Sequence, residues 1–419
     1  MKIQKENLYT IMFVLILFSQ LYVSSFRVNI FFQITVLTFF INFFRLSFSK
    51  VYIQLIAPLF YILLIGFIGT IINKYRFVDI LKDIFHIIKP ILGCLIGYLF
   101  YQRINDMKKF FKTIVLCGFI SALIHFIILF TVGDLLSGSV TSIREYSRDN
   151  FLELFALVFL IFYKKFNGER LILSSFYHKI ICIVLLVSNI LYFSRTMIGV
   201  FIILLLSVYG FTVVTRRGIR IMGFFIISVL GLYLYLYSVK IDRSKPGLES
   251  FLYKVKIAPA EMFKTKIDRE NHKDLWDHWR GYEAKRAISL MNDNPSSYGI
   301  GCGYGSLVNL KFFAPLTDNY KEKGMKYISE LHNGYVFILY KVGLLGLIIY
   351  LMFLFNLYKI IYTNHDFITI IISAIGLIFI FTTLTITGAY NARDIIVFIL
   401  GALLYFKTKH KTMTLRESV

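Results

Sequence analysis

His332 is the residue of this chain best suited to move a proton. It lies in the segment Glu330-Leu331-His332-Asn333-Gly334-Tyr335, where a long polar stretch gives way to an apolar one. Because the ordinary pKa of histidine is near neutrality, a histidine in this place can act as a general base on a hydroxyl group. The alternative is a histidine at the boundary of the two stretches that hydrogen-bonds Asn333 or Glu330.

Two arginines, Arg195 and Arg280, are candidates for binding a diphosphate. A guanidinium donates two parallel hydrogen bonds to phosphate oxygens and keeps its charge at every physiological pH. The alternative is a set of salt bridges, since Glu283 lies three residues from both Arg280 and Arg286 and can pair with either on one helix face. Arg286 is therefore a second candidate for the role given to Arg280.

A string of small residues, Gly299-Ile300-Gly301-Cys302-Gly303-Tyr304-Gly305, follows the region of Arg280. Glycines such as Gly301 and Gly303 let backbone N–H groups come close to an anionic group, although a plain turn explains them as well. The string lacks the lysine of a phosphate-binding loop, and no predicted strand precedes it as in a dinucleotide fingerprint. The spacing of the four cysteines resembles neither a metal site nor a disulfide framework, and we expect no metal and no cofactor.

Composition decides the setting in which these residues act. The chain has 419 residues, of which 57% are hydrophobic and 17% charged, with 43 phenylalanines. Soluble domains average about 25% charged residues and could not bury so much apolar surface. The composition therefore predicts an all-α polytopic membrane protein and excludes a soluble enzyme, a secreted disulfide scaffold and a disordered chain. The net charge of +22 fits lysines and arginines kept in cytoplasmic loops rather than nucleic-acid binding.

About twelve apolar stretches approach the length of a membrane span. They cover residues 8–24, 28–44, 51–72, 84–102, 113–134, 150–166, 179–194, 196–215, 220–239, 331–356, 367–388 and 395–407. Most lysines and arginines of the short connections fall on one side if both termini are cytoplasmic. The prediction is a membrane domain over residues 1–239, a large periplasmic loop over 240–330, and three spans with a cytoplasmic tail over 331–419.

Ionisable residues inside these stretches lie mostly toward the outer face: His86, Lys89, His125, Glu153 and Lys341. Such residues are costly in a bilayer and suggest function by default. Lys341 stands about ten residues into its stretch, which predicts a position near mid-bilayer at ~1.5 Å per residue. We expect a polar cavity open to the outer face. The alternative is snorkelling, which explains Lys89 and Glu153 well and Lys341 and His125 poorly.

The loop itself is expected to be ordered, because it combines aromatic residues, a helical pattern and glycine turns. Its apolar residues fall on one helical face, namely Trp276, Trp279, Ala284, Ala287, Ile288 and Met291. Pro295 is expected to end this helix. The division of the spans into nine before and three after the loop argues against two similar halves.

The order of these segments resembles the bacterial O-antigen polymerase and O-antigen ligase superfamily (Wzy and WaaL). The resemblance covers residues 185–350 and rests on Ser194-Arg195-Thr196, Trp279-Arg280, Asp293-Asn294-Pro295, the string Gly299 to Gly305, His332-Asn333-Gly334-Tyr335, and Lys341-Val342-Gly343-Leu344-Leu345-Gly346. Two departures are the second arginine, Arg286, and one extra small residue between Tyr298 and Gly305.

The resemblance implies a metal-independent glycosyltransferase with a GT-C-like fold in the bacterial inner membrane. Its substrate would be an undecaprenyl-diphosphate-linked glycan, and a chain-length regulator protein would be a candidate partner. Arg195 and Arg280 would bind the diphosphate and His332 would activate the acceptor hydroxyl. The residues expected to contact substrate besides these are Arg286, Gly301, Gly303, Asn333 and Lys341.

Three functions remain open from the sequence. A polymerase joining lipid-linked repeat units is favoured, because the first half of the chain diverges from the superfamily, as polymerases with varied glycans tend to do. A ligase transferring the finished glycan to lipid A–core differs little in sequence. A transporter or flippase would instead show two repeats of six spans, which the nine-plus-three division does not.

Overall fold

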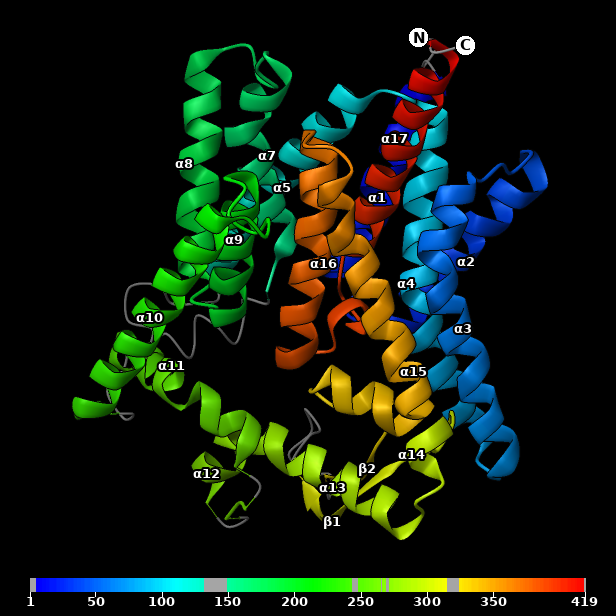
Figure 1. Ribbon diagram of the computed structural model, residues 1–419, viewed down its shortest axis with the longest axis vertical. Coiled ribbons are helices and arrows are strands. Elements are labelled where there is room, and N and C mark those ends of the chain that lie inside the picture. Colours follow the sequence, from blue (N-terminus) through cyan, green and yellow to red (C-terminus); the bar gives the residue numbers. More distant parts are fainter. Residues whose placement is uncertain are drawn as a thin grey trace.

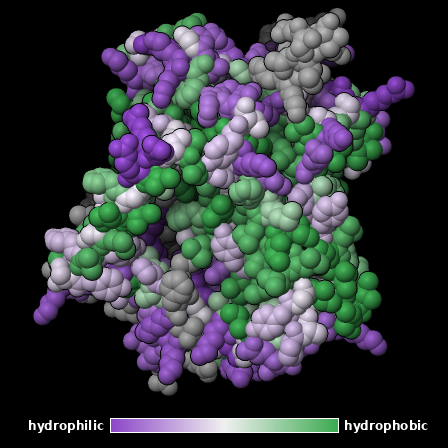
Figure 2. Space-filling model, viewed as in Figure 1, coloured by the Kyte–Doolittle hydropathy of each residue, from purple (hydrophilic) through white to green (hydrophobic). Residues whose placement is uncertain are grey.

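The computed structural model describes residues 5–131, 149–242, 248–264, 266–268, 271–314 and 324–417. Long helices form a bundle, and the helices and strands of the large loop lie against one end of it (Figure 1). The first turn of α1 and the last turn of α17 lie at the opposite end of the bundle (Figure 1). Hydrophilic residues gather at both ends of the face seen in Figure 2, and apolar residues gather between them.

Each predicted span falls on one helix of the bundle. The helices before the loop are α1 (Lys5–Tyr22), α2 (Phe26–Phe43), α3 (Lys50–Ile72), α4 (Phe77–Ile104), α5 (Met107–Thr131), α7 (Phe151–Asn167), α8 (Ser175–Leu191), α9 (Arg195–Val208) and α10 (Arg216–Ser238). Those after it are α15 (Gly334–Lys359), α16 (Phe367–Thr385) and α17 (Ile396–Glu417), with short 3-10 turns at Ile360–Tyr362 and Gly388–Tyr390. Residues 132–134 of the fifth predicted span lie outside the described residues.

Seven of the described helices are long and apolar enough to cross a membrane: α2, α3, α4, α5, α10, α16 and α15 with its following 3-10 turn. The others are shorter or less apolar, and α8 and α9 are short apolar helices. The mostly helical membrane character is therefore confirmed, while the number of twelve spans and the GT-C-like arrangement stay predictions.

The packing of α4 against α17 explains why the last helix is an integral part of the bundle. A side chain at Gly97 would come within 2.1 Å of the Phe398 carbonyl, and one at Gly401 within 2.1 Å of the Cys94 carbonyl. Small residues at these places let the two backbones touch, as at other helix interfaces in membranes. The first and last parts of the chain are thereby joined in one core.

The loop contains a small two-stranded sheet besides its helices, so the chain is mostly helical rather than all-α as predicted. Its helices are α11 (Leu248–Phe263), α12 (His272–Asp277), α13 (Trp279–Asp293) and α14 (Ser297–Ile300). Strands β1 (Val308–Ala314) and β2 (Met325–Ile328) pair antiparallel, with Val308 opposite Ile328. The Tyr282 hydroxyl of α13 donates to the Leu310 carbonyl of β1 at 2.5 Å. The sheet therefore supports the helix that carries Arg280.

The helix predicted in the loop is present as two helices, α12 and α13. It breaks at His278, so Trp276 belongs to α12 and is 41% exposed, whereas Trp279 opens α13 and is buried. Helix α13 ends at Asp293, two residues before Pro295, as expected.

Helix α15 is broken at Gly343, where the sequence predicts one continuous span. Gly343 has φ +75° and ψ −174°, which is not helical, and the two arms run in different directions (Figure 1). A side chain at Gly343 would lie 2.4 Å from the Gly299 carbonyl oxygen. The break lets the glycine string pack against the first arm, which lies at the loop end of the bundle.

Candidate functional site

Helix α13 presents two of the groups that form the candidate site. Arg280 and Glu283 are three residues apart and therefore lie on neighbouring turns of one face. Glu283 is 1% exposed, yet it turns toward His332 rather than toward Arg280 or Arg286. The predicted pairing of Glu283 with these two arginines is therefore wrong.

His332 is held by Glu283. Its Nδ1 lies 2.5 Å from Glu283 Oε1, and its backbone N–H donates to Oε2 at 3.3 Å. The His332 side chain is 55% exposed, so Nε2 is the nitrogen left for a substrate when Nδ1 donates to the carboxylate. Burial of the ring lowers the pKa of His332, but the charge and hydrogen bond of Glu283 raise it by more, and the net pKa is raised.

The neighbours that the sequence suggested for His332 have other partners. Asn333 caps α15, because its Oδ1 accepts from the backbone N–H groups of Tyr335 and Val336 at 3.1 and 3.2 Å. Glu330 lies 2.9 Å from His86 Nε2. The alternative of a histidine bound to Asn333 or Glu330 is therefore wrong, and Asn333 holds the helix start that follows His332.

Arg195 and Arg280 meet on a single carboxylate, that of Glu261 in α11. Arg195 Nη2 lies 3.1 Å from both Glu261 oxygens, and Arg280 Nη1 lies 3.0 Å from Oε2. Arg195 also donates to the Lys254 carbonyl. The side chains of Arg195 and Arg280 are 21% and 27% exposed, so both remain open to solvent. The structure thus brings together two arginines that the sequence separates widely.

The electrostatics of this meeting point favour an anion. Arg195 is the first residue of α9 and Arg280 the second of α13, where the positive end of a helix dipole adds to the guanidinium charge. Two guanidinium groups thus face the Glu261 carboxylate. Glu261 itself gives no signal in the sequence, because it is one acidic residue among several in the loop.

Arg286 lies apart from this meeting point. It is 9% exposed, and its Nε donates to the Asn309 carbonyl of β1 at 2.9 Å. Its Nη1 donates to Ser289 Oγ at 3.3 Å. Of the two arginines that the sequence offered on this helix, Arg280 is therefore the one beside Arg195, while Arg286 fastens α13 to the sheet.

The glycine string packs helices together, and most of its backbone N–H groups donate within the chain. A side chain at Gly301 would lie 2.4 Å from the Lys341 backbone, and one at Gly303 would lie 2.2 Å from Thr70 N. The backbone N–H groups donate within the chain: Gly301 to Ser297 O (2.8 Å), Cys302 to Tyr340 O (2.7 Å), Gly303 to Lys341 O (3.0 Å), Tyr304 to Thr70 Oγ1 (2.7 Å) and Gly305 to Asp83 Oδ2 (2.7 Å). The N–H groups of Gly301 and Gly303 are therefore already paired, which does not favour the predicted anion contact.

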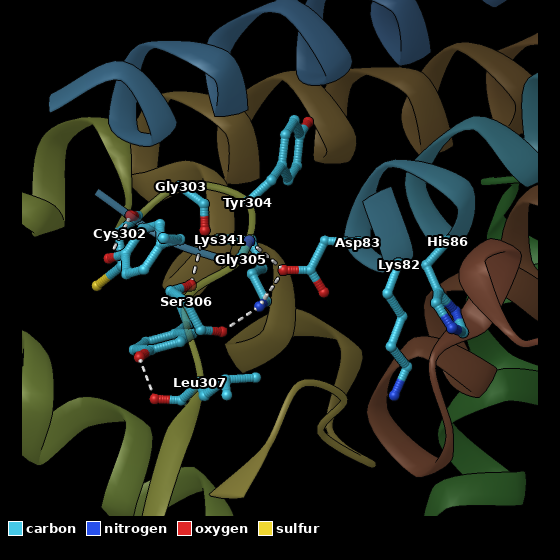
Figure 3. Close-up of polar contacts among 12 residues, drawn as sticks. Lys82, Asp83, His86, Cys302, Gly303, Tyr304, Gly305, Ser306, Leu307 and Lys341 are labelled. Carbon is cyan, nitrogen blue, oxygen red and sulfur yellow. Dashed lines mark hydrogen bonds and ion pairs between the residues drawn. The ribbon is translucent and has the colours of Figure 1, made fainter. Parts of the chain in front are cut away.

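Lys341 is fully buried and links the segment after the glycine string to α4. Its Nζ lies 2.6 Å from Asp83 Oδ2 and donates to the Ser306 carbonyl (Figure 3). It precedes the break at Gly343, so it lies at the loop end of the bundle rather than deep in a continuous span. Neither the predicted mid-bilayer position nor the predicted substrate contact fits this buried ion pair.

The other ionisable residues of the spans fall into separate buried groups rather than one outer cavity. Glu153 accepts from Ser188 at 2.5 Å and from Tyr192 at 2.9 Å, and Ser188 also contacts His125. Lys89 donates to the carbonyl oxygens of Asn391 and Asp394. Both Lys89 and Glu153 are 0% exposed, so snorkelling does not describe them. Lys89, His125 and Glu153 therefore make hydrogen bonds inside the bundle, whereas His86 lines a cavity near the loop.

Three cavities surround the site. One of about 200 Å³ is lined by His332 together with Glu330, Thr387 and Ala392. A second, of about 570 Å³, shares Glu330 and Ala392 with the first. A third, of about 260 Å³, is almost wholly apolar and is lined by α7, α8, α9 and Phe251, up to Ser194 beside Arg195. The site therefore adjoins two cavities with mixed polar and apolar walls and one apolar groove.

A comparison with known protein families matches one part of the chain. Residues 180–351 match the family model described as O-antigen ligase, and no curated protein matches the chain. The match spans α9, the whole large loop and most of α15, and so contains Arg195, Glu261, Arg280, Glu283 and His332. With its apolar helices, the chain is an integral membrane protein. Residues 180–351 are thus similar to the O-antigen ligase family, and this similarity supports the predicted resemblance to the superfamily of O-antigen polymerases and ligases.

Proposed function

We propose that this protein is a polymerase that joins undecaprenyl-diphosphate-linked oligosaccharide repeat units at the periplasmic face of the inner membrane. The observation that carries the proposal is the convergence of Arg195 and Arg280 next to the His332–Glu283 pair. Glycosyl transfer from a lipid diphosphate needs a cation where the leaving group gains charge and a base where the acceptor loses a proton. The two arginines and the histidine supply these in one place.

In the proposed step, an acceptor hydroxyl oxygen forms a bond to the anomeric carbon of the donor's first sugar. The bond between that carbon and the diphosphate oxygen breaks, and undecaprenyl diphosphate leaves with the electron pair. The hydroxyl proton passes to His332 Nε2, while Glu283 stabilises the resulting imidazolium. The arginines stabilise the departing charge without titrating, so the step requires no metal.

Glu261 holds the two arginines together in the absence of donor. A diphosphate carries more charge than a carboxylate and offers more acceptor oxygens, so it competes well for both guanidinium groups. The apolar groove beside Ser194 suits the polyprenyl chain, because it lies next to Arg195 and is lined by side chains such as Leu154, Met197 and Phe201.

The orientation in the membrane follows from the same proposal. The site lies at the loop end of the bundle, and α1 begins and α17 ends at the other end (Figure 1). Basic residues of the short connections favour cytoplasmic termini. The loop and the site would then be periplasmic, where nucleotide-activated sugars are absent and a lipid-linked donor is needed.

The ligase is the second candidate, because the matched family model is described as O-antigen ligase. The polymerase is preferred on account of the residues before 180, which lie outside the match. A surface-polysaccharide gel of a strain lacking the gene separates the two. A polymerase predicts a core that carries a single repeat unit and no ladder. A ligase predicts a bare core and accumulated lipid-linked polymer. An unchanged ladder contradicts both.

A further inference from the structure

One cavity near the site opens on the side of His332 formed by α2, α4 and the connection between α16 and α17. It measures about 570 Å³, and the residues that give it chemical character are Phe26, Arg27, Lys82, Phe85, His86 and Glu330. It shares Glu330 and Ala392 with the smaller cavity that contains His332. A ligand in the larger cavity can therefore extend toward the His332 ring.

The walls of this cavity combine aromatic rings with exposed charges. The Phe26 ring stacks on His86 with centroids 4.0 Å apart and an angle of 15°. Lys82 and Glu330 are 3.5 Å apart and are 41% and 43% exposed. Burial raises the pKa of Glu330, but hydrogen bonds and charges from His86 and Lys82 lower it by more, so the net pKa is about 2. Glu330 is thus a charged acceptor in a wall that also offers apolar faces.

This combination suits a saccharide. Sugar rings have apolar C–H faces that pack on aromatic rings and hydroxyl groups that donate to carboxylates, and mixed pockets of this kind fix a ligand's orientation. Lys82 and His86 point away from Asp83, which faces Lys341 instead (Figure 3). On α4, Asp83 thus faces the packed interior at Lys341, while Lys82 and His86 line the cavity.

The position of the cavity relative to the arginines decides which substrate it takes. Arg195, Arg280 and Glu261 belong to α9, α13 and α11, whereas the cavity belongs to α2, α4 and the segment around Ala392. A base must reach the acceptor hydroxyl, and His332 lines the cavity that leads there. We propose that the pocket of Phe26, Arg27, Lys82, Phe85, His86 and Glu330, here termed the acceptor pocket, binds the acceptor saccharide. This inference rests on the proposed function.

The kinetic test separates acceptor from donor. The repeat-unit oligosaccharide, released by mild acid from its lipid, lacks the diphosphate and can act only as acceptor. Phe26→Ala is expected to raise the KM for this oligosaccharide about tenfold, the equivalent of about 1.4 kcal/mol. The KM for the lipid-linked donor should stay unchanged. Lys74→Ala removes an exposed cation at the same end of the molecule, outside the acceptor pocket, and is the matched control.

A second variant guards against misfolding of the first, and a binding measurement tests the pocket without requiring activity. Ala392→Leu narrows the passage shared by the two cavities and should also raise the acceptor KM. A diazirine on the released oligosaccharide should label peptides around Phe26 and Lys82, and unlabelled oligosaccharide should reduce the labelling. Unchanged acceptor KM in both variants, or labelling around Glu261 instead, overturns the inference. If the oligosaccharide labels the pocket but the protein transfers no glycan, the proposed function is overturned and saccharide binding by the pocket is still supported.

Discussion

The His332–Glu283 pair sets the protonation chemistry of the site at the scale of single residues. A nearly fully buried carboxylate 2.5 Å from Nδ1 fixes the ring orientation and leaves Nε2 for the substrate. Glu283 is a positioning residue, since it acts through His332. His332→Ala is expected to lower transfer at least about 10²-fold while the protein still accumulates in the membrane, as scored on extracted membranes. Wild-type polymer in that variant would remove His332 from the mechanism.

The raised pKa of His332 predicts the pH dependence of transfer. The base form is needed, so the rate should fall as the pH drops through a value above the ordinary 6.5 of histidine. Glu283→Gln removes the charge that raises this pKa, so the acidic limb should move to lower pH and the maximal rate should fall. A pH–rate profile with purified protein measures both effects. A limb that stays in place would show that Glu283 only supports the fold.

The two arginines of α13 provide a matched pair. Arg280→Lys is expected to lower transfer about 10²-fold, because lysine cannot reproduce the guanidinium contacts on the leaving group. Arg286→Lys should retain most of the rate, since Arg286 binds the Asn309 carbonyl rather than the site. Initial rates at saturating donor distinguish the two variants. The reverse result would return the role of the diphosphate ligand to Arg286.

Glu261 is predicted to compete with the donor. Glu261→Gln leaves Arg195 and Arg280 without their carboxylate, so the thermal midpoint without ligand should fall. Inorganic diphosphate should then raise that midpoint more in the variant than in the wild type, because binding stabilises the folded state. Equal shifts in both proteins would mean that Glu261 does not occupy the anion site.

The predictable part of the site consists of residues with a distinctive type and place. Arg195, Arg280 and His332 stand out because each lies at the edge of an apolar stretch or heads a helix. Glu261 could not be found in this way, because its partner Arg195 lies 66 residues away. The spacing of Glu283 pointed to Arg280 and Arg286 rather than to His332, which lies 49 residues away. Lys341 was predicted to contact substrate because a cation in an apolar stretch suggests function. Its partner Asp83 could not be recognised from the sequence.

At the scale of elements, the break in α15 is what brings the loop against the bundle. Gly343→Ala is expected to destabilise the protein by about 1–3 kcal/mol from its backbone conformation alone. The added methyl group would also meet the Gly299 carbonyl. Gly299→Ala is the control, since nothing lies within 4 Å of the position of its added side chain. Thermal midpoints of the two purified variants test this, and equal midpoints would contradict the account of the break.

Hydrophobic runs predicted the helices well, because each predicted span coincides with one helix. They could not predict the break in α15, because Gly343 lies in an uninterrupted apolar run and its conformation depends on contact with Gly299. The β1–β2 sheet was missed because β2 has only 4 residues, which is too short for a clear alternating pattern.

At the scale of the whole molecule, buried ion pairs tie distant parts of the chain together. Asp83 of α4 and Lys341 of α15 are 1% and 0% exposed, and Asp83 also accepts from Gly305 N–H. Lys341→Met alone is expected to cost about 3–5 kcal/mol, because it leaves a buried carboxylate unpaired. Asp83→Leu combined with Lys341→Met should recover much of that stability. Restored transfer in the double variant would confirm that Lys341 holds the fold, and folded but inactive protein would make it a substrate contact.

We propose that one site, made by the loop and the loop end of the bundle, transfers a glycan from a lipid diphosphate to a hydroxyl group. Reconstitution of the purified protein in lipid nanodiscs with the lipid-linked repeat unit and excess EDTA tests this proposal. We expect longer lipid-linked glycans and one free undecaprenyl diphosphate for each bond formed, with neither product from the His332→Ala protein. Intact donor with wild-type protein, or equal products with the variant, would contradict it.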